Sequence, residues 1–196
     1  MDKSLLSLFT SRVRLKILGL FTVNPGKLFY VREVERMIGE QINAVRRELA
    51  TLTKIGFLRN EPRGNRIYYQ VRSDFLYFPE LLRIVSKSTG LGAEILRKKN
   101  ELGNLKYVLF AAPFVKGRKT RGNQIDLLIV GKVHLEKVKE IVSAAEKLRG
   151  QEINYTIMTE DEFIFRKKRN DDFLKNILSQ PQVVVLGDED GLNKKN

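Results

Sequence analysis

Six polar residues between positions 41 and 66 have the side-chain types and spacing to bind a polyanion. Two are amides and four are arginines: Gln41, Asn43, Arg46, Arg47, Arg63 and Arg66. An arginine can pair bidentately with guanine, and an asparagine or glutamine with adenine. An arginine at a hairpin tip suits phosphates or a narrow minor groove. These residues therefore predict contacts with double-stranded DNA.

A helix from about residue 42 to residue 54 has to position the first four of these residues. Val45, Leu49 and Leu52 fall on one face of that helix and can anchor it to a core. The polar residues then project from its exposed N-terminal turns. Each arginine taken alone is also explained as part of a solvated surface, and it is their combination on one scaffold that favours DNA.

The elements around this helix predict the scaffold. Apolar residues at helical spacing in 13–21 are followed by the turn Asn24-Pro25-Gly26, and residues 29–31 are β-prone. A second helix through Val34 and Ile38 ends at Gly39. After the third helix, segments 57–59 and 67–71 read as strands around a hairpin tip at 61–65. This order is that of a winged helix-turn-helix.

Segments 11–18, 30–34, 44–49 and 56–58 resemble the arsenic-repressor-like winged-helix regulators, over roughly residues 4–75. The sequence departs from that family at Glu40, where an apolar residue is usual, and at Ile42. The resemblance implies DNA binding by a homodimer that reads two half-sites about one DNA turn apart. Spare apolar residues for dimerisation lie in 75–85 and in a first helix, at Leu5, Leu6, Leu8 and Phe9. Packing against the second half of the chain explains them equally well.

Charge and composition are compatible with the same class of partner. The chain has 36 Lys and Arg against 23 Asp and Glu, a net charge of +13, and residues 1–100 hold 19 of the basic but only 9 of the acidic residues. Such asymmetry suits nucleic acid because phosphate contacts release condensed counterions, and a solubilising surface explains it equally well. Cysteine is absent and His134 is the single histidine, which excludes disulfides and thiolate metal sites and argues against Ser-His-Asp catalysis. No apolar run is long enough to span a membrane.

The C-terminal half resembles a different family. Residues 122–131 are similar to the signature strand of the DNA polymerase beta-like minimal nucleotidyltransferases, and residues 109–117 stand where that family has its Gly-Ser motif. The similarity spans about 105–187 and implies a strand, loop, strand, helix, strand order with a two-metal site built on carboxylates. Here the first metal position is Gln124, Asp126 remains, and the third falls near Asn154, with Glu152 the nearest acid. Ala111, Ala112 and Pro113 replace the phosphate loop, so we expect no transferase activity, no metal and no cofactor.

Several charged residues of this half have both a functional and a structural interpretation. Asp126 is either a vestige of a metal site or a cap that holds a loop by hydrogen bonds, and we favour the cap. A basic loop could hold an anionic ligand or a DNA phosphate, although a solvated loop explains it as well: Lys116, Arg118, Lys119 and Arg121. The run 166–169 is either a phosphate-contact patch or a charged helix surface, and Thr159 reads as a helix N-cap.

Together these features predict an α+β protein. A winged helix-turn-helix over residues 1–75 is followed by a helical linker over 76–104, a small α/β nucleotidyltransferase-like domain with a mixed sheet over 105–187, and a mobile tail over 188–196. We expect a cytoplasmic, sequence-specific DNA-binding transcriptional regulator, with a catalytically dead second domain for dimerisation or for sensing a nucleotide or other anionic effector. The alternatives are an active nucleotidyltransferase of a toxin–antitoxin type system and a protein-interaction scaffold.

Overall fold

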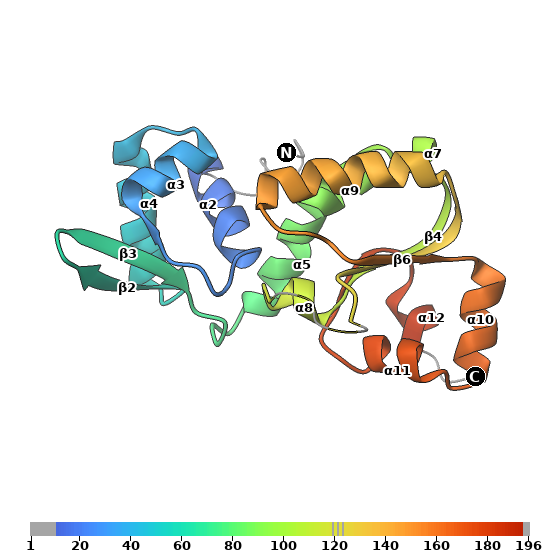
Figure 1. The fold of residues 1–196 in the computed structure, drawn as a ribbon. Coiled ribbons are helices and arrows are strands. Elements are labelled where there is room, and N and C mark those ends of the chain that lie inside the picture. The colour runs from blue at the N-terminus through green and yellow to red at the C-terminus, as the bar shows by residue number, and fades with distance from the viewer. Residues whose placement is uncertain (1–10, 119, 121, 123, 194–196) are drawn as a thin grey trace. The chain divides into compact units, whose positions relative to one another are not determined.

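The computed structural model describes residues 11–118, 120, 122 and 124–193 and divides the chain into two compact units, Met1–Ser88 and Thr89–Asn196 (Figure 1). The segment predicted as a helical linker, 76–104, is divided between the two units. Helix α5 (Phe78–Ser88) belongs to the first unit, and the helices after it belong to the second. The physical reason is that α5 packs on helix α2 (Arg12–Thr22) and so extends the first core.

The first unit is a winged helix-turn-helix by its element order and strand pairing. A three-stranded antiparallel sheet has the order β1-β3-β2 and accompanies the helices. The further elements in chain order are β1 (Phe29–Tyr30), α3 (Val31–Ile38), α4 (Ile42–Lys54), β2 (Leu58–Arg63) and β3 (Arg66–Val71).

Local sequence explains where these helices begin and end. Ser11 caps α2, because its hydroxyl accepts a hydrogen bond from the Arg14 amide at 3.1 Å. Gly39 ends α3 in the left-handed conformation with φ +63°, and Gly56 follows α4 with φ +81°. Glycine adopts this conformation without the steric cost of a Cβ, so both predicted stops are confirmed. The apolar residues proposed for dimerisation at 5–9 lie outside the described residues.

The hairpin is longer than the sequence indicated. Strands β2 and β3 continue to Arg63 and Arg66, which face each other, so that the turn consists of Gly64 and Asn65 alone. Gly64 has φ +58°, as the first position of a two-residue hairpin turn favours. The expected tip at 61–65 is therefore wrong, because residues 61–63 belong to β2. Since β2 is an edge strand, Pro62 is accommodated there without a lost ladder bond.

The second unit is an α/β structure around a four-stranded mixed sheet of order β6-β5-β4-β7. Strand β5 pairs antiparallel with β4 and parallel with β6, and β7 pairs antiparallel with β4. The mixed sheet predicted for this half is confirmed. Its elements in chain order are α6 (Gly90–Arg97), α7 (Lys99–Leu102), β4 (Gly103–Phe110), α8 (Ala112–Val115), β5 (Leu127–Val133), α9 (Leu135–Arg149), β6 (Tyr155–Met158), α10 (Glu160–Lys168), α11 (Asp172–Leu178), β7 (Val183–Leu186) and α12 (Glu189–Asn193).

Helix α9 lies on one face of this sheet, and α10, α11 and α12 lie on the other (Figure 1). Residues 127–130 of β5 are fully buried, as expected for a strand that is covered on both faces. Leu109 and Leu128 join Phe163 and Leu174 in the core between the sheet and α10 and α11.

Two helical expectations differ in detail. A single helix over 93–102 becomes α6 and α7, which break at Lys98, and the helical segment 160–178 is interrupted by Asn170, whose φ is +51°. In the tail predicted to be mobile, 188–196, residues 189–193 form α12, in which Leu192 is completely buried, and residues 194–196 lie outside the described residues. Within the described residues, every helix is too short or too polar to cross a lipid bilayer.

Candidate nucleic-acid interface

Helix α4 is anchored on its core face and open on the opposite one. Val45 and Leu49 are fully buried, and Leu52 is 1% exposed. The four polar residues predicted for DNA contact in this part are all exposed and lie at or after the N-terminus of the helix: Gln41, which is the N-cap, Asn43, Arg46 and Arg47. The structure therefore brings them together on one accessible surface.

The turn that leads into α4 is held by charge. Lys16 of α2 donates to Oε1 of Glu40 at 2.5 Å and to the Ile38 carbonyl at 2.8 Å, and Arg12 lies 3.2 Å from the same Glu40 oxygen. The Lys16 hydrogen bond holds the pKa of the Glu40 carboxyl below its ordinary value, with burial acting in the opposite direction. Glu40 thus holds this turn by ion pairs with Lys16 and Arg12.

A second clamp connects α2 with the body of α4. The Ser11 hydroxyl donates to one oxygen of Glu48 at 2.6 Å, and Arg14 Nε donates to the other at 2.8 Å. These two clamps occupy Arg12, Arg14 and Lys16 within the fold. Among the residues that the structure describes, Arg32, Arg46 and Arg47 form no ion pair, so their charges remain available to a ligand.

We call the hairpin of β2 and β3 (58–71) the wing. Neighbouring side chains hold its arginines Arg63 and Arg66. The guanidinium of Arg66 lies 4.5 Å from the centre of the Tyr30 ring, and that of Arg63 lies 5.7 Å from the Tyr68 ring. Tyr30 and Tyr68 meet edge to face at 5.6 Å, since β1 pairs with β3 at these residues. Arg63 also forms an ion pair with Glu61. Both predicted wing arginines are exposed, and stacking fixes their direction.

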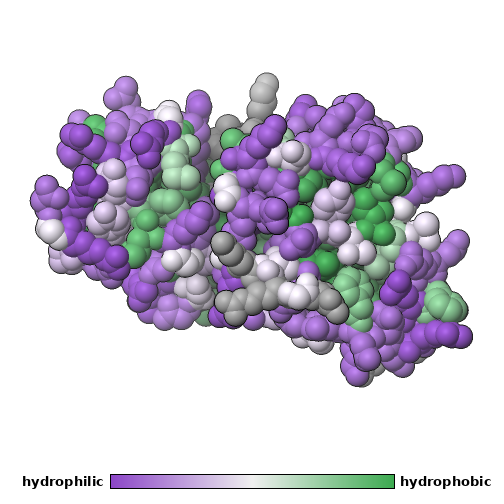
Figure 2. All heavy atoms as spheres, in the orientation of Figure 1, coloured by the Kyte–Doolittle hydropathy of each residue, from purple (hydrophilic) through white to green (hydrophobic). Residues whose placement is uncertain are grey.

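A concavity of about 650 Å³ opens between α3, α4 and the wing. Arg32, Arg46 and Arg66 line it, one from each of these three parts, together with Tyr30, Val31, Asn65, Ile67 and Tyr69. Burial raises the pKa of the Tyr69 phenol, and the charge of Arg46 acts in the opposite direction. Hydrophilic side chains cover most of the face of the first unit that Figure 2 shows.

Sequence reasoning missed four polar or aromatic residues of this concavity: Tyr30, Arg32, Asn65 and Tyr69. Tyr30 could have been found from the alternation of side chains in β3. A strand that pairs with β3 places one residue beside Tyr68 on the same face, and that residue is Tyr30. No comparable signal existed for Arg32, whose position depends on how α3 is oriented toward α4.

Asp126 in the second unit is a buried structural group. It is 1% exposed, and its Oδ2 accepts hydrogen bonds from the Thr120 hydroxyl at 2.5 Å and the Asn154 amide at 3.0 Å. Its Oδ1 has no hydrogen-bond partner within the part of the chain that the structure describes. Hydrogen bonds of the kind made by Oδ2 are what the interpretation as a loop cap predicts. Arg149 lies 4.0 Å above the Phe114 ring, and burial lowers its pKa while the charge of Asp126 raises it.

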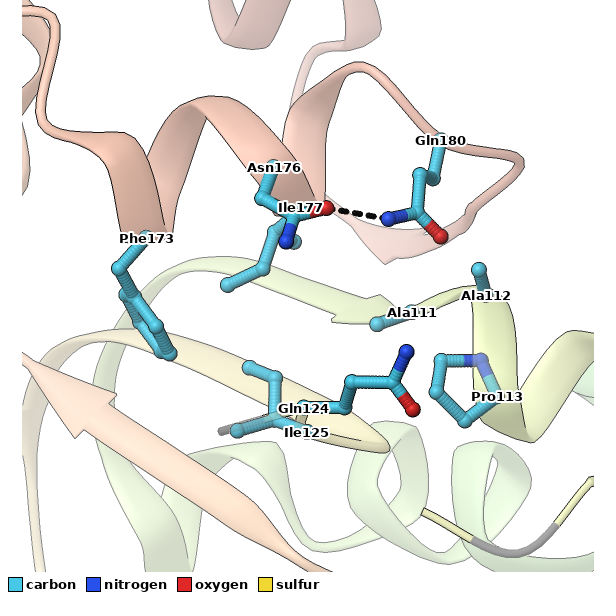
Figure 3. Close-up of a pocket in the computed structure, with 9 residues that line it drawn as sticks. All are labelled: Ala111, Ala112, Pro113, Gln124, Ile125, Phe173, Asn176, Ile177 and Gln180. Atoms are coloured by element: carbon cyan, nitrogen blue, oxygen red, sulfur yellow. Dashed lines mark hydrogen bonds between the residues drawn. The ribbon is translucent and has the colours of Figure 1, made fainter. Parts of the chain in front are cut away.

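Gln124 occupies a different environment from Asp126. It lines a small cavity with Ala111, Ala112 and Pro113, beside Ile177 and other residues of α11 (Figure 3). The cavity has about 30 Å³ of space, enough for one or two water molecules but far below the ~300 Å³ of a small-molecule site. Asp126, which the nucleotidyltransferase resemblance places in one metal site with Gln124, does not line this cavity.

The two basic segments of the second unit differ in whether their side chains are free to bind an anion. Lys116 and Arg118 of the loop after α8 are exposed, whereas Lys119 and Arg121 lie outside the described residues. In the 166–169 run, Arg166 pairs with Glu162 and Asp171, Lys167 donates to the Gly191 carbonyl at 3.0 Å, and Arg169 stacks on Phe165 at 4.7 Å. This run therefore serves mainly intramolecular contacts. The predicted N-cap is confirmed, because the Thr159 hydroxyl accepts from the Glu162 amide at 3.1 Å.

No protein-family model matches the sequence, and the search of curated proteins finds no match. Among solved structures the chain is similar to "Reduced HlyU from Vibrio cholerae N16961", with 19% identity, a TM-score of 0.33, and coverage of 43% of this chain and 80% of that one. The likeness is too low to indicate a function, and the winged-helix assignment depends on this chain's own strand pairing.

Proposed function

We propose that this protein is a sequence-specific transcriptional regulator that binds double-stranded DNA through α4 and the wing. One observation carries the proposal: α4 is fixed to its core by Val45, Leu49 and Leu52, and its opposite surface presents Arg46 and Arg47, which form no ion pair with any described residue. An α-helix fits the major groove of B-DNA, where the base edges carry a distinguishable pattern of donors and acceptors. In this proposal, Arg63 and Arg66 on the wing contact the backbone or the minor groove next to it.

Selection of bound fragments from a pool of random duplex DNA tests this function. The proposal predicts that a common motif is enriched over successive rounds and that binding of this motif weakens steeply with salt, by about 0.9 in log–log slope for each neutralised phosphate. If the purified full chain recovers fragments without a common motif at every salt concentration tested, sequence-specific binding is contradicted. Capture of a protein partner without DNA enrichment would favour an interaction scaffold.

The second unit serves in this proposal as a catalytically dead nucleotidyltransferase-like domain for dimerisation or for sensing an anionic effector. Support comes from its mixed sheet, from the amide at Gln124, and from the internal hydrogen bonds of Asp126. Incubation with labelled ATP and Mg²⁺ or Mn²⁺ tests the absence of transfer. Label transfer by the wild type that disappears in Asp126→Ala would instead establish an enzyme.

A homodimer is part of the same proposal, since paired winged helices read two half-sites. Leu76 and Tyr77 are 75% and 60% exposed and offer apolar surface near α5. Sedimentation equilibrium tests this part by itself. A dimer in the micromolar range is expected, and a monomer throughout that range contradicts it without affecting the DNA-binding proposal.

A further inference from the structure

We propose that the concavity between α3, α4 and the wing binds the phosphodiester backbone of one DNA strand, so that Arg46 contacts phosphate and Arg47 reads bases. This inference rests on the proposed function and assigns different tasks to two neighbouring arginines. It also adds Arg32, which the sequence did not single out, to the interface.

The charge of the concavity points to an anion. Three guanidinium groups, from Arg32, Arg46 and Arg66, line one space, and no acidic residue lines it with them. Like charges that converge raise each other's electrostatic energy, and an anion between them removes that cost. The volume of about 650 Å³ is larger than a single phosphate needs and suits a length of sugar-phosphate backbone.

Neutral donors complete the site. Asn65 at the wing turn and the Tyr69 phenol both line the concavity. Tyr69 is 9% exposed, and among the described residues its hydroxyl makes no hydrogen bond, so it can donate to a phosphate oxygen. Arg66 is held by its stacking on Tyr30, which reduces the side-chain entropy that is lost when it binds. Phosphate contacts in protein–DNA complexes commonly use this mixture of arginine, tyrosine and amide groups.

Helical geometry separates Arg46 from Arg47. Consecutive residues of an α-helix point about 100° apart, and residues four apart share a face. Arg46 turns toward the wing and lines the concavity, whereas Arg47 does not line it and shares its face of α4 with Asn43. One side of the helix is thus suited to the backbone and the neighbouring side to base edges.

Fluorescence anisotropy with the full chain tests the assignment, on a selected duplex and on a random duplex, over a series of salt concentrations. Arg32→Ala, Arg46→Ala and Arg66→Ala are each expected to lower the affinity for both duplexes equally. At 0.1 M salt the affinity is expected to fall about eightfold, which is the contribution of one released counterion. The log–log slope of affinity against salt concentration should fall by about 0.9. Arg36→Ala, which removes the same charge from α3 outside the concavity, serves as the matched control.

Lysine substitution separates the two arginines. A lysine supplies a point charge to a phosphate but cannot replace a bidentate contact with a base. Arg46→Lys should therefore retain affinity within about twofold and keep the salt slope, whereas Arg47→Lys should lose discrimination between the selected and random duplexes by about tenfold. Thermal unfolding of each variant verifies that it is folded.

The outcomes separate this inference from the proposed function. If the wild type binds no duplex, both are wrong. If the wild type selects a motif but Arg32→Ala and Arg36→Ala have the same small effect, the function stands and the phosphate site is overturned. If inorganic phosphate at millimolar concentration binds the wild type but not Arg32→Ala, while the DNA affinities of the two proteins are equal, the concavity binds a free anion and the DNA-backbone assignment is overturned.

Discussion

Lys16 and Glu40 are joined across 24 positions of the chain by a hydrogen bond of 2.5 Å between Nζ and Oε1. Because Lys16 also donates to the Ile38 carbonyl, one ammonium group ties α2 to the end of α3 and to the turn that precedes α4. The orientation of the proposed DNA-reading helix therefore depends on a charged contact between α2 and the turn before α4.

Glu40→Gln is expected to destabilise the first unit. The amide keeps the shape of the side chain but loses the ion pairs with Lys16 and Arg12, at a cost of about 1 kcal/mol after allowance for solvent screening. Thermal unfolding followed by circular dichroism measures the loss. Glu35→Gln on α3 is the matched control, since Glu35 forms no ion pair among the described residues.

The effect of Glu40→Gln on stability is expected to depend on pH. The folded state lowers the pKa of Glu40 below its ordinary value of 4.5, so the carboxylate stabilises the fold above pH 4.5 and this contribution is lost as the pH falls through the lowered pKa. The stability difference between the wild type and Glu40→Gln should therefore be largest near neutral pH and disappear in acid. A difference that stays constant from pH 7 down to pH 3 would contradict the clamp.

Arg47→Ala should cost about 1–3 kcal/mol on a selected duplex if Arg47 contacts a base edge, and much less on random DNA. Anisotropy titrations at one fixed salt concentration measure both values. Arg59→Ala is a suitable control, because Arg59 lies on the wing and is hydrogen-bonded to Gln70 at 3.0 Å. Equal losses on the two duplexes would remove Arg47 from base recognition.

Tyr30 and Arg66 should be energetically coupled in DNA binding. The ring fixes the guanidinium 4.5 Å from its centre, so Tyr30→Leu should weaken binding only while Arg66 is present. A double-mutant cycle with Arg66→Ala is expected to give a coupling of about 0.5–1 kcal/mol. Tyr30→Phe keeps the ring and should behave as the wild type. Additive effects of Tyr30→Leu and Arg66→Ala would show that the stacking has no role in binding.

Asp126 is expected to be a stability residue of the second unit. Asp126→Ala leaves the Asn154 amide without its buried acceptor and should lower the free energy of unfolding by about 1–3 kcal/mol. Asp126→Asn retains an acceptor oxygen and should cost less. Urea unfolding measures both variants, with Glu152→Ala, an exposed acid of the same region, as the control. If Asp126→Ala is as stable as the wild type, the carboxylate has no structural role.

Local patterns in the sequence predicted most of the first unit. The spacing of Val45, Leu49 and Leu52 gave α4 its correct limits, and Gly39 and Gly56 marked the correct helix ends. The predicted strands of the wing were too short by several residues, because whether a strand tolerates Pro62 depends on whether that strand lies at the edge of the sheet. That place is a property of the sheet and cannot be read from the residue itself.

Contacts between distant residues account for what the sequence could not predict. The Glu40 clamp requires α2 beside the turn, and the concavity requires α3, α4 and the wing to converge, so neither has a local signature. The polar composition of 188–196 predicts a mobile tail, whereas Leu192 is completely buried in α12. In each case a long-range contact decided the outcome over local composition.

Amide chemical-shift mapping of the full chain upon addition of a selected duplex tests the central claim most directly. The predicted result is that the largest changes fall in residues 41–47 of α4 and residues 63–66 of the wing, with Arg32 among them. Changes confined to the second unit, or an unperturbed α4 in the presence of bound DNA, would contradict it.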